Sequence, residues 1–381
     1  MILLKNTCIL CDTNSTVGIS KGKITFKISD VPPNAIKLIL DNTLTFPGLI
    51  NSHDHLDYNL LPQFDTGKCN NYVEWARELT ARWQPEIDAI RKVPEHLSTQ
   101  WGLYKNLLNG ITHVVNHNET IDIKDPLINI FKNCHSLHSV VMQRQWKYKL
   151  NDPFNWKWPY VFHIGEGIDE WSSRDIDTLL KWNYLGKKLI GVHGVAMNEK
   201  QAKKFKALIW CPDSNLFMFK KTAPVADLKR KVKMLFGTDS TLSANWSIWK
   251  HLRKALDTGM ANKDELLAML NLNAAEVWRI KNHGIKEGND ANLVVAKKKS
   301  ADAKNAFFEI GPEDILLVIC NGKIKLFDES IRQQLKEQRF DLQEFSGIEI
   351  KGRTKYVYGD LPGLVKNINS HCPSISFPFN C

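Results

Sequence analysis

The stretch Pro47-Gly-Leu-Ile-Asn-Ser-His53-Asp-His55 is an apolar run that ends in two histidines one residue apart. Residues i and i+2 of a β-strand point to the same side, so both imidazoles can reach one metal ion. Asp54 points to the opposite side and is expected to be structural. A chain with twelve histidines can contain such a pair by chance, so the pair needs support from the rest of the sequence.

The middle of the chain alternates short apolar runs with helical stretches, which is typical of βα units and a parallel sheet. Strands are predicted at 112–116, 139–142, 160–162, 189–192, 207–210 and 232–236, and helices at 72–82, 95–108, 175–185, 199–205, 248–258 and 263–271. Residues 46–284 approach the length of a TIM-type barrel, about 250 residues. We therefore predict an α/β fold with a (β/α)8 TIM-type barrel. Its fourth unit, Gln143 to Pro159, is short for a complete strand, helix and return.

Both ends of the chain alternate apolar and polar positions, which is the pattern of half-buried strands. The pattern covers Gly22–Ile28 and Ile36–Leu40 near the start. It returns near the end at 291–296, 315–320 and 323–327, where Asn321-Gly322 is a turn signal. We predict that residues 1–45 and 285–330 form one small β-sandwich. Residues 331–381 are expected to form a helix, 331–339, and a tail without identifiable chemistry.

Composition excludes several classes of protein. With 43% hydrophobic and 24% charged residues, the chain is typical of soluble globular proteins. No run approaches the roughly 20 apolar residues that span a bilayer, and the start lacks a signal-peptide pattern, so we expect a cytoplasmic protein without a membrane partner. The net charge is +10, but Lys and Arg are mixed with acids along the chain, which argues against a nucleic-acid partner. Eight scattered cysteines indicate reduced thiols. A homodimer is compatible with these features.

Further metal-ligand and acid–base residues follow the predicted strands. His163 follows strand 160–162 with Glu166 three residues on, His193 follows strand 189–192, and Asp239 follows strand 232–236. Barrel enzymes place their sites at the carboxyl ends of the strands. Each of these residues taken alone is more often a hydrogen-bonded core histidine or a capping carboxylate. Their occurrence at successive strand ends favours one functional site.

These motifs resemble the amidohydrolase superfamily, in particular the branch with cytosine and guanine deaminases and triazine chlorohydrolases. The resemblance covers nearly all of residues 1–330 and rests on the 47–55 opening, His163-x-x-Glu166, Val192-His193-Gly194, Cys211-Pro-Asp-Ser-Asn215, Gly237-Thr-Asp239-Ser240 and Gly288-Asn-Asp-Ala-Asn-Leu-Val-Val295. It implies that His53, His55, His163 and Asp239 ligate one divalent ion, zinc in preference to iron. It also implies that Glu166 and His193 act without ligation. The chain departs from the pattern at Asn292, where Asp is more usual, and offers no clear strand lysine to bridge two metals.

The resemblance implies a metal-dependent hydrolase of carbon–nitrogen bonds other than peptide bonds. A divalent ion lowers the pKa of bound water toward about 7. Asp239 suits the role of ligand and partner to the water's proton, and Glu166 can carry that proton to the departing nitrogen. His193 would hydrogen-bond the water or polarise the substrate. We expect hydrolytic deamination of a heteroaromatic ring. The alternatives are a hydrolase of cyclic amides or carbon–halogen bonds, and a non-catalytic binding protein on the same fold.

Contacts to the small-molecule substrate are harder to predict from the sequence, because such contacts lie on loops. Tyr58, Gln143, Arg144 and Ser240 lie near strand ends at the same rim and are predicted to line the pocket. For the other histidines, a packing role is the simpler expectation.

Overall fold

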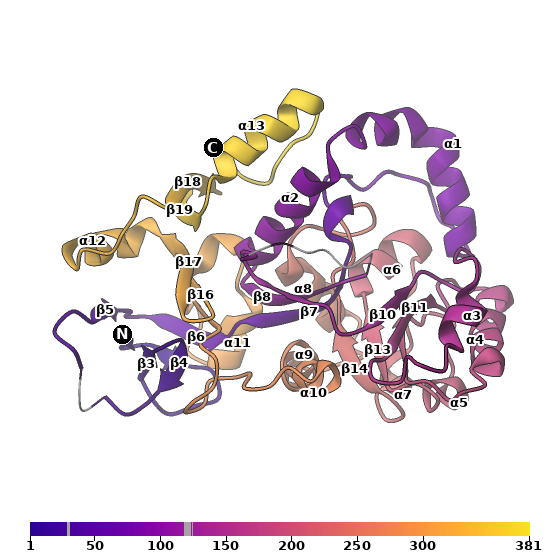
Figure 1. Ribbon diagram of the computed structural model, residues 1–381, viewed down its shortest axis with the longest axis horizontal. Coiled ribbons are helices and arrows are strands. Elements are labelled where there is room, and N and C mark those ends of the chain that lie inside the picture. Colours follow the sequence, from indigo (N-terminus) through magenta and orange to yellow (C-terminus); the bar gives the residue numbers. More distant parts are fainter. Residues whose placement is uncertain (29–30, 118–122, 124) are drawn as a thin grey trace.

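The computed structural model describes residues 1–28, 31–117, 123 and 125–381 and has an α/β fold in which parallel strands lie among helices (Figure 1). One parallel sheet holds β7 (Leu49–Asp54), β8 (Ile111–Asn116) and β9 (Asn129–Phe131). A second parallel sheet holds, in order, β10 (His135–Leu137), β11 (Tyr160–Ile164), β12 (Leu189–His193), β13 (Ala207–Trp210) and β14 (Lys233–Phe236). The carboxyl end of β14 lies beside that of β7, because the main-chain N–H groups of Thr238 and Asp239 donate to the His53 carbonyl at 3.0 and 3.1 Å.

The parallel strands are buried on both faces, as expected for strands that read as nearly continuous apolar runs. Every residue of β11, β12 and β13 is buried. Alternate side chains pack into different apolar clusters. Leu208 and Trp210 belong to one cluster, and Ile209 and Leu235 belong to another. The sheet is therefore packed on both sides, and its strand ends are held in fixed positions.

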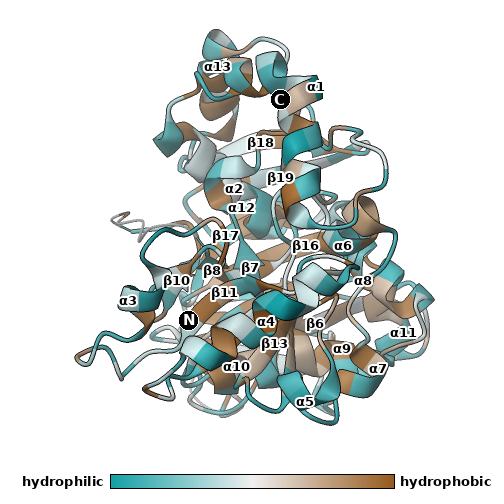
Figure 2. Ribbon diagram, turned by 90° about the vertical axis from the view of Figure 1, so that its right-hand side faces the viewer, coloured by the Kyte–Doolittle hydropathy of each residue, from teal (hydrophilic) through white to brown (hydrophobic). Residues whose placement is uncertain are grey.

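The helices predicted from the sequence are present. They are α1 (Tyr72–Ile90), α2 (Glu95–Leu108), α4 (Glu170–Trp182), α5 (Glu199–Ala202), α8 (Ile248–Asp257) and α9 (Lys263–Leu270). Helix α2 has the predicted ends, and the others are shifted at one or both ends. Helix α4 begins earlier than predicted because Asp169 caps it, accepting from the Ser172 N–H. Figure 2 shows largely hydrophilic residues on the sides of α4 and α5 that face the viewer. The sequence analysis did not identify α6 (Pro212–Phe219), α7 (Val225–Leu228) and α10 (Leu272–Trp278).

The strand predicted at 139–142 is wrong. This segment is a turn in which the Ser139 hydroxyl accepts from the Met142 N–H at 3.0 Å, and it leaves Val141 and Met142 exposed. The strand lies just before it, at β10, and pairs in parallel with β11. The next helix, α3 (Trp146–Leu150), has five residues, in agreement with the short fourth unit.

The two chain ends supply two further sheets. The first runs β4 (Lys23–Thr25), β3 (Thr16–Ser20), β1 (Ile2–Lys5) and β5 (Ile36–Ile39). The second runs β18 (Phe345–Ile350), β19 (Arg353–Tyr358), β17 (Lys323–Asp328), β16 (Ile315–Cys320), β15 (Leu293–Lys297), β6 (Thr43–Pro47) and β2 (Cys8–Ile9). Leu4 and Val17 of the first sheet share one apolar cluster with Leu293 and Leu317 of the second. Strands from both ends of the chain thus bury one common core.

The segment 331–381 has more structure than the sequence predicted. After α12 (Glu329–Glu337) it forms the hairpin β18–β19, which extends the second sheet because β19 pairs with β17. Helix α13 (Leu361–His371) then packs against α2 (Figure 1). Among the described residues, no helix is long and apolar enough to cross a membrane.

Candidate metal centre

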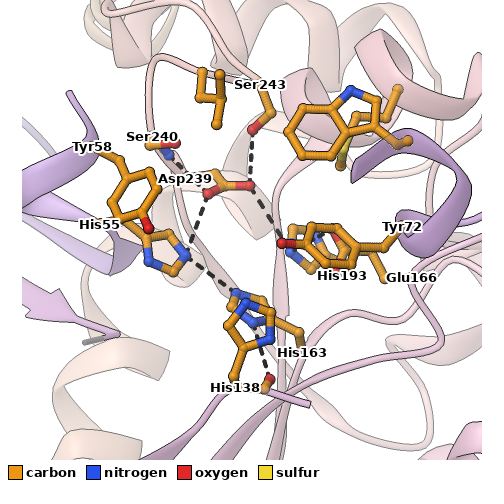
Figure 3. Close-up of a pocket in the computed structure, with 13 residues that line it drawn as sticks. His55, Tyr58, Tyr72, His138, His163, Glu166, His193, Asp239, Ser240 and Ser243 are labelled. Atoms are coloured by element: carbon orange, nitrogen blue, oxygen red, sulfur yellow. Dashed lines mark hydrogen bonds and ion pairs between the residues drawn. The ribbon is translucent and has the colours of Figure 1, made fainter. Parts of the chain in front are cut away.

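Three imidazoles meet where β7 and β11 end. His53 and His55 come from the end of β7, and His163 comes from β11. The Nε2 atom of His163 lies 3.2 Å from that of His53. It lies 3.3 Å from that of His55 (Figure 3). The Oδ1 atom of Asp239 completes the group, at 3.8 Å from His53 Nε2 and 3.7 Å from His55 Nε2.

This spacing fits a divalent ion. Nitrogen ligands at 2.0–2.1 Å in a tetrahedral zinc site are separated from one another by about 3.3–3.4 Å. The two imidazole separations match that value, and three nitrogens with one carboxylate oxygen are donors that zinc accepts. His53, His55 and His163 also form a group whose ligand atoms all lie within 4.8 Å of one another. The donor set therefore fits one divalent metal.

The protonation states support the same conclusion. Burial, followed by the neighbouring His55 ring, lowers the pKa of His53 well below its usual value. Burial, followed by the His117 ring, does the same to the pKa of His163. Nδ1 of His163 lies 3.0 Å from the His138 carbonyl, to which it donates, so Nε2 of the neutral ring carries no proton. The lone pair of that nitrogen points at the cluster.

Asp239 is held in place by hydrogen bonds to its carboxylate. The Ser240 N–H donates to Oδ1 at 2.8 Å, and the hydroxyls of Ser214 and Ser243 donate to Oδ2 at 2.8 and 3.1 Å. Burial opposes ionisation, but the rings of His193 and His55 and these hydrogen bonds outweigh it and hold the pKa of Asp239 below its usual value. The group is thus a carboxylate at neutral pH.

Glu166 and His193 form an adjacent acid–base pair. Glu166 Oε1 lies 3.4 Å from His193 Nε2, and Asp239 Oδ2 lies 3.9 Å from the same nitrogen. Burial and then the negative charge of Asp239 raise the pKa of Glu166 well above its usual value. A carboxyl group with a raised pKa can both accept and release a proton near neutral pH.

A chain of hydrogen bonds fixes the tautomer of His193. The Trp210 indole N–H donates to Thr222 Oγ1 at 2.6 Å, and the Thr222 hydroxyl donates to Asn215 Oδ1 at 3.3 Å. This orients the amide so that Asn215 Nδ2 donates to His193 Nδ1 at 2.9 Å. Burial lowers the pKa of His193 to about 4, so the neutral ring carries its single proton on Nε2. By distance alone, His193 could hold a metal ion together with His53 and Asp239. Because its Nε2 carries a proton, however, His193 is a hydrogen-bond donor and not a ligand through that atom.

A cavity of about 100 Å³ opens beside the cluster (Figure 3). Besides five of the residues above, its walls include Tyr58, Tyr72, Trp75, His138, Met218, Ser240, Leu242 and Ser243. Tyr58 and Ser240, two of the four residues predicted to line the pocket, are thus among the lining residues of this cavity. Gln143 and Arg144 are not among the described lining residues. They lie in the turn before α3, where Gln143 Nε2 donates to the Arg144 carbonyl.

Three prominent lining residues were not predicted from the sequence. His138 directly follows β10, so the rule that sites follow strand ends would have identified it had β10 been located. Tyr72 and Trp75 lie three residues apart at the start of α1, on one face of the helix. That spacing is common in helices that pack on a core, and the sequence alone does not distinguish a cavity wall from a core face.

Residues 157–325 match the family model described as the amidohydrolase family. A curated 5-methylthioadenosine/S-adenosylhomocysteine deaminase from Pyrococcus furiosus is 22% identical over 354 residues, which cover 75% of this chain and 84% of that protein. The chain spans about half the length, 52% and 50%, of the proteins of the same name from Pyrococcus horikoshii and Pyrococcus abyssi.

Solved structures share the fold along nearly the whole chain. An adenosine deaminase from Xanthomonas campestris with bound zinc has a TM-score of 0.68 and 18% identity, covering 98% of each chain. A triazine hydrolase from Arthrobacter aurescens has a TM-score of 0.66 and 16% identity, covering 97% of this chain and 99% of the other. At these identities, both structures establish likeness of fold.

Proposed function

We propose that this chain is a member of the amidohydrolase family, whose model matches residues 157–325, and that it is a metal-dependent hydrolase that deaminates an aminated heteroaromatic ring. The cluster of His53, His55 and His163, with the Asp239 carboxylate within 3.8 Å of two of its nitrogens and a cavity lined by Glu166 beside it, is the observation that carries this proposal. We propose zinc in preference to iron, since three imidazoles and one carboxylate are donors that zinc accepts.

Each residue around the cavity has a separate role in the proposed reaction. A divalent ion held by the four ligands would supply Lewis acidity and make water a nucleophile at neutral pH. Glu166 takes a proton from the attacking water and returns it to the departing nitrogen, so that the ring gains oxygen and ammonia leaves. His193 donates from Nε2 to the oxygen as it attacks, and Asp239 accepts a hydrogen bond from the same water through its carboxylate.

The walls of the cavity favour a flat, uncharged substrate. Tyr58, Tyr72 and Trp75 provide aromatic surface, and Met218 and Leu242 provide apolar surface. No Lys or Arg lines the cavity in the part of the chain that the structure describes, while two carboxyl groups do. The described walls therefore offer no side-chain ammonium or guanidinium group to a phosphate or carboxylate on the substrate. The names of the relatives, which are adenosine-type deaminases, favour an aminated purine ring.

His138 is a further candidate for a substrate contact. Its Nδ1 is buried and has no hydrogen-bond partner among the described residues, and the ring lines the cavity. Burial, followed by the His55 ring, lowers the pKa of His138 to about 4. The neutral ring can therefore donate to or accept from a nitrogen of the substrate ring. We assign Tyr58 and Ser240 to the same wall.

Strands β7 to β14 follow the order of a (β/α)8 barrel, and we propose that they form one over residues 46–284. The neighbouring ends of β14 and β7 support closure at that seam, whereas β9 and β10 have no described pairing. We further propose that residues 1–45 and 285–330 form a β-sandwich, supported by the apolar cluster that their sheets share. A cytoplasmic location, the absence of a nucleic-acid partner and a homodimer stay predictions from the sequence.

Ammonia release across a panel of aminated purines, pterins and pyrimidines tests the proposed reaction. We expect at least one uncharged ring to release ammonia, with the activity lost after treatment with a chelator and restored by zinc. The same assay includes cyclic amides and a chlorinated triazine, with chloride measured for the latter. Turnover of these compounds without ammonia from any ring would replace deamination by the alternative hydrolase reactions. No turnover of any compound would favour a binding protein.

A further inference from the structure

A buried lysine lies directly beneath the metal centre. Lys105 is near the carboxyl end of α2, and its side chain is 1% exposed. Helix α2 approaches the segment after β7 very closely, because a Cβ atom on Gly102 would lie only 2.3 Å from the Leu56 carbonyl oxygen. This close packing brings Lys105 to the side of the β7 end that faces away from the metal ligands.

The Lys105 ammonium contacts three residues on two separate segments. Its Nζ lies 2.7 Å from Asn59 Oδ1, 3.1 Å from Asp54 Oδ2 and 3.3 Å from the Asp239 carbonyl oxygen. An ammonium group has three protons to donate, so its capacity is used in full. Asp54 lies between His53 and His55, and Asp239 follows β14. One side chain thus joins the two segments that carry three of the four candidate ligands.

Asp54 is also fully engaged. Besides Lys105, its carboxylate accepts from Asn106 Nδ2 at 2.7 Å and from Asn59 Nδ2 at 3.0 Å. Its side chain is completely buried. These contacts of the Asp54 carboxylate fix the main chain between His53 and His55 on the side opposite the two imidazoles. Lys105 neutralises the charge of the carboxylate.

Asp239 needs support from outside its own segment. Its φ angle is 59°, in the left-handed region that residues with a Cβ seldom adopt. Its N–H donates to the His53 carbonyl, and its own carbonyl accepts from Lys105. With both ends of the residue held, the carboxylate is directed at His53 and His55.

We propose that Lys105 is a positioning residue that sets the separation between Asp239 and the two histidines of β7, and so sets the affinity for the metal. The inference rests on the proposed function only through the four ligands. The competing view is that Lys105 merely neutralises a buried carboxylate. On that view, removal of both charges together would leave the metal centre unchanged.

The paired variant Asp54→Asn with Lys105→Met separates the two views. It removes both buried charges and leaves no charge without a partner, so it stays testable even where Lys105→Met alone does not fold. A matched control is Asp328→Asn with Lys355→Met. That pair is equally buried, with Nζ 2.6 Å from the carboxylate, and Lys355 likewise donates to main-chain carbonyls, but the pair lies in the sheet of the chain ends. Zinc-free preparations of all proteins are titrated with zinc against a competing chelator.

We expect the Asp54→Asn/Lys105→Met protein to fold and to bind zinc about 10–100-fold more weakly, the usual effect of losing a group that orients a ligand. The Asp328→Asn/Lys355→Met protein should bind zinc as the native chain does. Native affinity in the first variant, or an equal loss in the control, would overturn the proposal. The readout is independent of the reaction: a native chain that binds zinc but releases no ammonia would refute the deaminase while leaving the role of Lys105 intact.

Discussion

Replacement of Glu166 by Gln tests the chemistry of the site most directly. The substitution keeps the shape of the side chain and its ability to hydrogen-bond, but removes its ability to exchange a proton. Glu166 Oε1 contacts His193 at 3.4 Å, and Glu166 belongs to neither group of residues that can hold a metal ion. The variant should therefore keep its metal and its cavity while losing the proton carrier.

The expected size of the effect follows from that single loss. Proton transfer by a positioned side chain contributes about 10²–10⁴-fold to a rate. At about 1.36 kcal/mol for each tenfold change, this corresponds to roughly 2.7–5.4 kcal/mol in the activation free energy. Because the substrate contacts the aromatic walls as before, kcat should fall by this factor and KM should change much less.

Steady-state ammonia release and metal analysis of the same preparation give both quantities. Glu170→Gln is the matched control, since Glu170 has a side chain that is 79% exposed and pairs with Arg174 on the surface of α4. The control should behave as the native protein does. If Glu166→Gln retains activity within a fewfold of native, or loses its metal, the role assigned to Glu166 is wrong.

Three other perturbations have defined outcomes. Asn215→Leu removes the donor to the buried His193 Nδ1, which is worth about 0.5–1.5 kcal/mol, so kcat should fall roughly 2- to 13-fold at constant zinc content; an unchanged kcat would contradict the tautomer assignment. Zinc at about 100 times its Kd should raise the free energy of unfolding by about 2.7 kcal/mol over the zinc-free protein in denaturant titrations, and no dependence on zinc would argue against the site. Burial lowers the pKa of His113 to about 3 and that of His283 to about 4, so the unfolded chain binds more protons below pH 6.5. Stability should therefore fall with decreasing pH, at most about 1.4 kcal/mol per unit for each histidine, and zinc-free His113→Asn should lose less between pH 6.5 and 5 than the native chain.

The candidate site could be predicted largely from strand ends. His53, His163 and Asp239 each end or follow a strongly apolar run, and such runs are recognisable because parallel strands are buried on both faces. Once the strands are located, their carboxyl ends meet at one rim, and residues far apart in sequence come together. Helix 95–108 was also predicted with its observed ends, since Pro94 precedes it and Gly110 follows it.

The remaining features depend on tertiary context that the sequence does not display. Strand β10 has the composition His-Ser-Leu and exists because it pairs with β11. The apolar run Val140-Val141-Met142 indicated a strand, yet local hydrogen bonding to Ser139 makes it a turn. Lys105 reads as an ordinary solvent-facing helix residue, and only the close approach of α2 at Gly102 places it in the interior. Secondary-structure propensity and hydrophobic periodicity describe single segments. Strand β10 and the burial of Lys105 instead depend on contacts between segments.

The contact between the C-terminal segment and α2 bears on how the protein can be shortened. Phe377 and Phe379 pack on Trp101 with ring centroids 5.0 and 5.7 Å away, and the Trp101 indole donates to the Asn59 carbonyl. The side-chain oxygen of Asn59 in turn accepts a hydrogen bond from the Lys105 ammonium. A fragment trimmed at residue 330 would keep every candidate ligand but lose the packing of Phe377 and Phe379 on Trp101. Such a truncation is therefore expected to disturb the contacts of Asn59 and Lys105 next to the candidate ligands without removing any ligand.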